Sequence, residues 1–211
     1  MSRLTRRGVL ALLLAAPYPP LWAQPVLTIA TQVRQRLVDA PVLRGEFEQR
    51  KTIKGFRHPL LSRGDFIVAR ERGVLWHTRE PFPSTLVLTR ERLLSRGADG
   101  SVAARLDARD EPGMRALNEL LFAIMATDLE ALQQRFRIEG ELVGGEGWRL
   151  QLVPRDSAVA QWVGRIELEG ERHVRSVRVS EAQGDASLIR FSAIATAAAL
   201  TREEAVRFES E

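Results

Sequence analysis

Apolar residues near the start of the chain change their spacing from a helical to a strand-like period. Positions 26, 29, 33 and 37 are apolar and follow one face of a helix, which predicts an amphipathic helix that Pro41 ends. From Val42 onward, apolar and polar residues alternate, with Phe47 between Glu46 and Glu48. The alternation predicts a half-buried strand whose two glutamates share the solvent side.

Further strand patterns follow, separated by turn-prone residues, and one helical segment interrupts them. The predicted strands are 64–70, 74–78, 84–89, 101–106, 135–142, 147–153, 164–169, 173–180 and 187–195. The helical segment begins with Asp110 as its cap and carries the apolar stripe Met114, Leu117, Leu121, Ile124 and Met125. Thr127 to Glu130 then forms a capping-box pattern, which predicts a second short helix through Gln134.

This order of elements predicts a single α+β domain. Its core is a large, curved antiparallel sheet with helices over one face, because the apolar strand faces need such a cover. A sheet that closes partly into a barrel also leaves an apolar concavity, which helices can fill or cover. We find no internal repeat or linker after Ala23.

The first 23 residues have the features of a cleavable signal peptide. Arg3, Arg6 and Arg7 precede the apolar run 9–16, which three prolines then interrupt. The run is too short to span a bilayer, and the prolines disfavour a buried helix of the folded domain. We therefore expect cleavage after Ala23, a mature domain of residues 24–211 and export to the periplasm. The arginine pair leaves both the general secretory and the twin-arginine routes open.

Charge and cysteine content exclude several classes of protein. The chain has 31 basic and 27 acidic residues, and removing the three leader arginines leaves 28 against 27. A balanced domain without a basic block makes nucleic acid an unexpected partner. The absence of cysteine excludes disulfides, Cys-ligated zinc, thiol catalysis and a lipidated N-terminal cysteine.

No residue pattern indicates catalysis, a metal site or a cofactor. His58, His77 and His173 lie on separate segments, and no GxSxG nucleophile motif occurs. Glu46 and Glu48 are interpreted as a solvent-facing pair, and the glycines at 144, 145 and 147 as a turn. The remaining feature is a set of aromatic and methionine residues on strands and on the covering helix. It fits either an ordinary filled core or a ligand cavity.

Five short sequence motifs are informative because of the order in which they occur along the chain. They are Phe47-Glu48-Gln49-Arg50-Lys51, Pro59-Leu60, residues 62–66, residues 73–82 and the ending 201–208. With the leader, this order resembles the LolA family of periplasmic outer-membrane lipoprotein carriers over nearly all of the mature chain. The low aromatic content and arginine-rich turns also fit a divergent relative that handles a glycolipid or another lipid.

The resemblance implies a half-open β-barrel with a helical lid, whose cavity shields acyl chains. Cargo would come from an inner-membrane ATP-driven extractor and pass to an outer-membrane acceptor, with a monomeric carrier and no cofactor or catalysis. The lipid-anchored acceptor of this fold, LolB, has an N-terminal lipidated cysteine, which this chain lacks.

The resemblance also suggests specific site residues. The cavity wall would be Phe47, Phe66, Trp76, Leu86, Leu88, Trp148 and Phe191. The lid would be Leu117, Leu121, Ile124 and Met125. Arg72, with Arg70 as the competing choice, would hold the lid closed by bonding to carbonyls of the 110–127 helix. Two alternatives stay open: an envelope interaction module of the same fold without cargo, and a hydrolase with a dispersed site.

Overall fold

The computed structural model describes residues 27–89, 91–107, 122–124 and 126–209. Eleven strands form one antiparallel sheet in the order β6-β5-β4-β3-β2-β1-β11-β10-β9-β8-β7, so that β6 and β7 are its edges. The strands are β1 (Val42–Thr52), β2 (Leu60–Ala69), β3 (Gly73–Glu80), β4 (Ser84–Leu88), β5 (Arg92–Gly97), β6 (Val102–Asp107), β7 (Phe136–Val143), β8 (Gly147–Pro154), β9 (Val163–Gly170), β10 (Val174–Glu181) and β11 (Ala186–Ala197).

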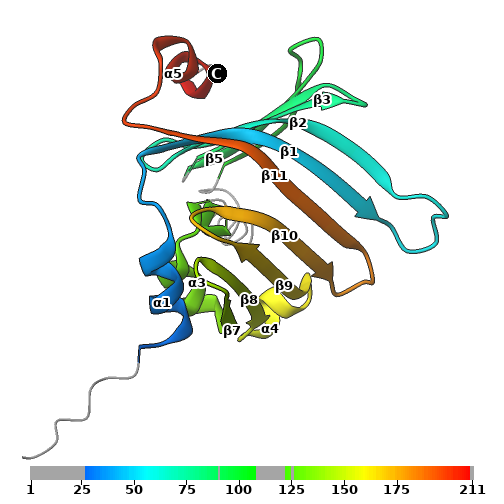
Figure 1. Ribbon diagram of the computed structural model, residues 1–211. Coiled ribbons are helices and arrows are strands. Elements are labelled where there is room, and N and C mark those ends of the chain that lie inside the picture. Colours follow the sequence, from blue (N-terminus) through cyan, green and yellow to red (C-terminus); the bar gives the residue numbers. More distant parts are fainter. Residues whose placement is uncertain (1–26, 90, 108–121, 125, 210–211) are drawn as a thin grey trace, which may run out of the picture.

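One long-range pairing joins two runs of hairpins into this sheet. Strands β1 to β6 and strands β7 to β11 each pair with their chain neighbours, and β1 pairs with β11 from Val42↔Ala197 to Thr52↔Ala186. Figure 1 shows the sheet curving around an interior without closing. The predicted α+β fold with a large, curved, half-open antiparallel sheet is confirmed.

The helices lie on both faces of the sheet. Helix α1 (Ile29–Arg36) begins at the N-cap Thr28, and α3 (Leu129–Arg135) begins at the N-cap Asp128. Both lie inside the curve of the sheet, beside the helical residues 122–124 and 126 (Figure 1). The short α4 (Ser157–Ala160) connects β8 to β9, and α5 (Arg202–Glu209) lies outside the curve. None of the described helices has the length and apolar character needed to cross a bilayer.

Side-chain alternation divides the apolar residues between two cores. On β2, Phe66 and Val68 point to the inner face, whereas Ile67 and Ala69 point to the outer face. The inner core continues under α1 and α3 into β7 to β10. The outer core is smaller and includes Phe208, through which α5 covers that face.

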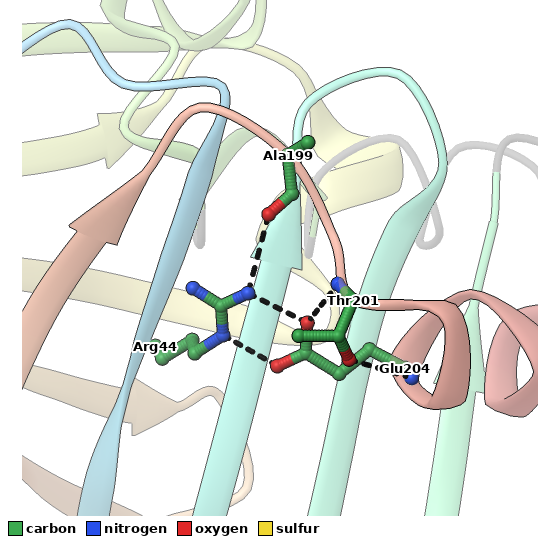
Figure 2. A network of polar contacts seen from close by, with 4 residues as sticks. All are labelled: Arg44, Ala199, Thr201 and Glu204. Atoms are coloured by element: carbon green, nitrogen blue, oxygen red, sulfur yellow. Dashed lines mark hydrogen bonds and ion pairs between the residues drawn. The ribbon is translucent and has the colours of Figure 1, made fainter.

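Arg44 attaches α5 to the outer face. Its guanidinium binds both carboxylate oxygens of Glu204, with 2.6 Å from Nη2 to Oε2, and donates to the Ala199 carbonyl at 3.3 Å (Figure 2). The Thr201 N–H donates to Glu204 Oε2, while the Glu204 N–H donates to the Thr201 hydroxyl. This reciprocal pair of hydrogen bonds is a capping box. Glu204 therefore caps the start of α5 and, through Arg44, also attaches α5 to the sheet.

The sequence patterns missed three elements, β5, α4 and α5, and misplaced one cap. Strand β5 carries Leu93 toward the inner core and Leu94 toward the outer core, so an adjacent apolar pair among arginines replaces the expected alternation. Helix α5 was not predicted either. The second short helix is confirmed, but its N-cap is Asp128, whose side chain accepts from the Ala131 N–H. Of the predicted lid residues, Leu117, Leu121 and Met125 lie outside the described residues, as does Asp110.

Candidate functional site

A cavity of about 620 Å³ lies between the inner face of the sheet and the helices. Its walls come from α1, residues 122–124 and 126–130, the cavity-facing parts of β1, β2 and β11, and the turn before β10. The larger apolar side chains in the lining are Leu37, Val38, Leu43, Phe66, Val68, Phe122, Ile124, Leu129, Val174, Phe191 and Ile194. A volume of this size is typical of sites for small ligands.

Exposed charged residues surround the opening of this cavity. We call this set the mouth: Arg34, Arg70, Asp128, Glu130 and Arg172. Asp39 lies beside it and forms ion pairs with Arg70 and with Arg34, the latter at 3.4 Å. The Arg70 hydrogen bond and then its charge hold the pKa of Asp39 below its ordinary value. These pairs join the segment after α1 to the turn between β2 and β3.

An aromatic cluster forms the end of the cavity and fills the inner face beyond it. Phe66 and Phe191 both line the cavity and meet edge to face, with ring centroids 5.1 Å apart. Behind them, Phe47 stacks on Trp76 with centroids 3.7 Å apart. Two rings of the cluster therefore line the cavity, and the other two belong to the packed core.

Two glycines make room for these rings on the neighbouring strands. Gly64 lies opposite Phe47, and Gly45 lies opposite Phe66. A Cβ at Gly64 would stand 1.9 Å from the His77 carbonyl oxygen and 2.8 Å from the Phe47 ring, and one at Gly45 would stand 2.8 Å from the Phe66 ring. Side chains at either position would displace the cluster.

The predicted wall residues divide between the cavity and the packed core. Phe66 and Phe191 line the cavity, and so does Ile124 from the predicted lid. Phe47, Leu88 and Trp148 are buried in the inner core, and Trp76 packs against this core by stacking on Phe47. Leu86 lies opposite Trp76 on β4. Trp148 is 1% exposed and donates its indole N–H to the Glu171 carbonyl at 2.6 Å. It is a satisfied core residue.

Arg70 and Arg72 lie in the same turn but contact different parts of the molecule. Arg70 lines the mouth, whereas Nη1 of Arg72 donates to Glu209 on α5 at 2.6 Å. The predicted partner of Arg72 was the 110–127 helix, most of which is outside the described residues. The partner that the structure gives Arg72 lies on the outer-face helix, whereas Arg70, the competing choice, lines the cavity.

His173 is a cavity residue that the sequence did not single out. Its Nε2 is buried and has no hydrogen-bond partner among the described residues. Burial first, then the charges of Arg175 and Arg172, lower its pKa below the ordinary 6.5, which favours the neutral ring. A lone histidine before a strand gave no signal of this, because the cavity forms from segments far apart in sequence. A neutral ring can hydrogen-bond a polar group of an amphiphilic ligand.

The sequence matches the family model for the outer membrane lipoprotein carrier protein LolA over residues 39–204. The chain belongs to the LolA family. Comparison with curated proteins finds no match.

Solved structures with related folds are distant in sequence. A domain assigned to outer membrane lipoprotein sorting, from Vibrio parahaemolyticus, is 11% identical, covers 83% of this chain and 93% of that chain, and has a TM-score of 0.46. A LolA superfamily protein from Nitrosomonas europaea is 12% identical over 84% and 97%, with a TM-score of 0.46. A DUF1329 family protein from Desulfovibrio piger is 12% identical over 82% and 92%, with a TM-score of 0.45.

Proposed function

We propose that this LolA-family protein is a soluble periplasmic carrier that shields acyl chains of lipoproteins, or of a related lipid, and delivers them toward the outer membrane. One observation carries the proposal: apolar side chains of the sheet and the helices line the cavity, and charged residues stand at its mouth. An acyl chain fits the interior, and its polar attachment fits the mouth. The mechanism requires no catalytic residue and no cofactor.

Transfer of acyl chains out of water supplies the binding energy. Each buried CH₂ contributes about 0.8 kcal/mol, so about ten methylenes contribute roughly 8 kcal/mol. Release requires an acceptor that offers the chains another apolar environment, because a carrier shifts its cargo only by differential affinity. An inner-membrane ATP-driven extractor and an outer-membrane acceptor would be the two partners of such a cycle.

Export by the leader expected at residues 1–23 would bring the carrier to the periplasm. The carrier would then be the mature domain, residues 24–211, acting as a monomer. The cysteine-free sequence supports a protein without its own lipid anchor.

The packed aromatic cluster favours a second candidate, an envelope interaction module of the same fold without cargo. Phe47, Trp76 and Trp148 fill much of the inner face. The two candidates differ in whether the cavity takes up an apolar ligand.

A charge placed inside the cavity separates these candidates. Ile194 lines the cavity, and Thr196 is exposed two residues further along β11. We expect Ile194→Glu to weaken binding of a fluorescent fatty-acid probe about tenfold or more, because a carboxylate is costly to bury beside an acyl chain. Thr196→Glu should bind the probe like the wild type. Equal binding by both variants, with unchanged thermal unfolding, would show that the probe does not enter this cavity.

A further inference from the structure

Exposed apolar side chains gather at one end of the sheet. The described residues include nine exposed large hydrophobics, and six of them lie on turns or strand starts at this end. We call these six the apolar rim: Phe56, Leu60, Leu61, Phe82, Val102 and Trp162. Phe82 is 82% exposed, and Phe56 and Trp162 are each 66% exposed. Single exposed apolar residues are ordinary, but a gathering at one end indicates a contact surface.

Strand register shows that the rim residues share this end. Lys51 pairs with Leu60 at the start of β2, and Arg63 of β2 pairs with Glu80, just before Phe82. On the other side of the sheet, Glu181 pairs with Val163, which follows Trp162. The hairpin ends concerned point to the right in Figure 1, away from α1.

Hydrogen bonds join the two sides of the rim. The Lys54 N–H donates to Asp185 Oδ1 at 3.0 Å, which ties the β1–β2 turn to the β10–β11 turn. The Ala182 N–H donates to the Trp162 carbonyl at 3.0 Å, which ties that turn to the start of β9. These bonds link the turn that carries Phe56 to the segment that carries Trp162.

The chain around the β1–β2 turn is basic as well as apolar. Residues 49–64 contain Arg50, Lys51, Lys54, Arg57 and Arg63 and no acidic residue. Both lysines of the protein are in this stretch. Lys51 and Arg63 pair with acidic neighbours, but Lys54 and Arg57 are exposed and form no ion pair with any described residue. Unpaired cations thus flank Phe56.

We propose that the apolar rim docks directly on an anionic membrane surface. Phenylalanine, leucine and tryptophan side chains favour the interface between headgroups and acyl chains, and nearby lysine and arginine are attracted to anionic headgroups. Apolar tips that project separately from four connections can enter a bilayer surface independently, with the intervening cations at headgroup level. This contact does not depend on the cargo of the cavity.

Vesicle sedimentation tests the proposal with the purified full chain. Wild-type protein should sediment with phosphatidylglycerol-containing vesicles at low salt and about tenfold less with pure phosphatidylcholine. Lys54→Glu with Arg57→Glu, and separately Phe56→Ser with Leu61→Ser, should each lower binding to the anionic vesicles about tenfold. All four positions are exposed, so the fold should tolerate these changes.

Matched variants outside the rim test whether vesicle binding depends on the rim itself or on exposed charge and apolar area in general. Arg175→Glu with Arg202→Glu reverses two exposed cations, and Leu27→Ser with Val143→Ser removes two exposed apolar residues, all outside the rim. These controls should bind within about twofold of wild type, with any leader contribution common to all variants. If wild-type protein does not sediment with anionic vesicles, the proposal is overturned, and a protein partner for the rim is favoured instead. Equal losses in rim and control variants would overturn it as well.

Discussion

Glu204 shows how a single ion pair fixes the outer-face helix. Its hydrogen bond with Arg44, opposed in part by burial, lowers the pKa of Glu204 from 4.5 to about 2. A carboxyl group whose folded-state pKa is depressed adds stability above its unfolded value, and that stability is lost as the pH falls toward the folded value. The contribution should therefore be complete above pH 4.5 and disappear between pH 4.5 and about 2.

Replacing the Glu204 carboxylate tests whether its protonation controls this part of the free energy of unfolding. Glu204→Gln should lower the free energy of unfolding by about 1–3 kcal/mol at pH 7, because it leaves Arg44 without its anionic partner. Urea unfolding should show wild type and variant converging as the pH falls from 4.5 to about 2. Glu203→Gln, on the same helix but exposed, is the control and should change little. A constant difference across this pH window would contradict the assignment.

Individual cavity residues were predictable from the sequence only where the alternation of apolar and polar positions fixes the face of the sheet on which a side chain lies. Strand period places Phe66 and Phe191 on the inner face, where both line the cavity. The same rule selected Trp148, which is core, because alternation separates the faces of a sheet but not a packed region from an open one. Arg70, Asp39 and His173 come together through tertiary contacts, for which the sequence offers no local signal.

At the scale of elements, the Asp39 ion pairs connect the end of α1 to the β2–β3 turn beside the mouth. Ligand exchange through the mouth should depend on how firmly these segments hold together. Exposed pairs of this kind have modest effects, so exchange rates should respond by a few-fold and not by orders of magnitude.

Comparing the two arginines of this turn tests that dependence. Arg70→Leu should speed release of a bound fatty-acid probe about two- to fivefold. Arg72→Leu should leave release unchanged, because Arg72 pairs with Glu209 on the outer face. Stopped-flow dilution measures both rates. Retained probe or stronger probe binding in Arg72→Leu alone would instead support Arg72 as the residue that holds the lid.

Strands in which apolar and polar residues alternate clearly were predictable from the sequence. Elements that bury residues on the outer face of the sheet, or on both of its faces, were not. Strand β5 has an inner and an outer leucine side by side, so its burial on two sides hides the period. Helix α5 exists because Phe208 covers an outer core that sequence reasoning did not foresee. The Thr201–Glu204 capping box was present as a local signal and would have marked its start.

The whole molecule is a curved sheet with different tasks on its parts. The inner face is packed at the aromatic cluster and open under α1 and α3, while α5 covers the smaller core on the outer face. One end of the sheet carries the apolar rim, and the cavity mouth lies toward the other. In the proposed carrier, different residues would therefore hold the cargo and contact the membrane surface.

Native mass spectrometry of the protein purified from the periplasm tests the central claim most directly. The account predicts a bound acylated species, one per chain, that is lost on delipidation and is absent from Ile194→Glu. Thr196→Glu should retain it. A wild-type protein that carries no such mass, and after purification also leaves a fluorescent fatty-acid probe in solution, would contradict the proposal that this cavity shields acyl chains.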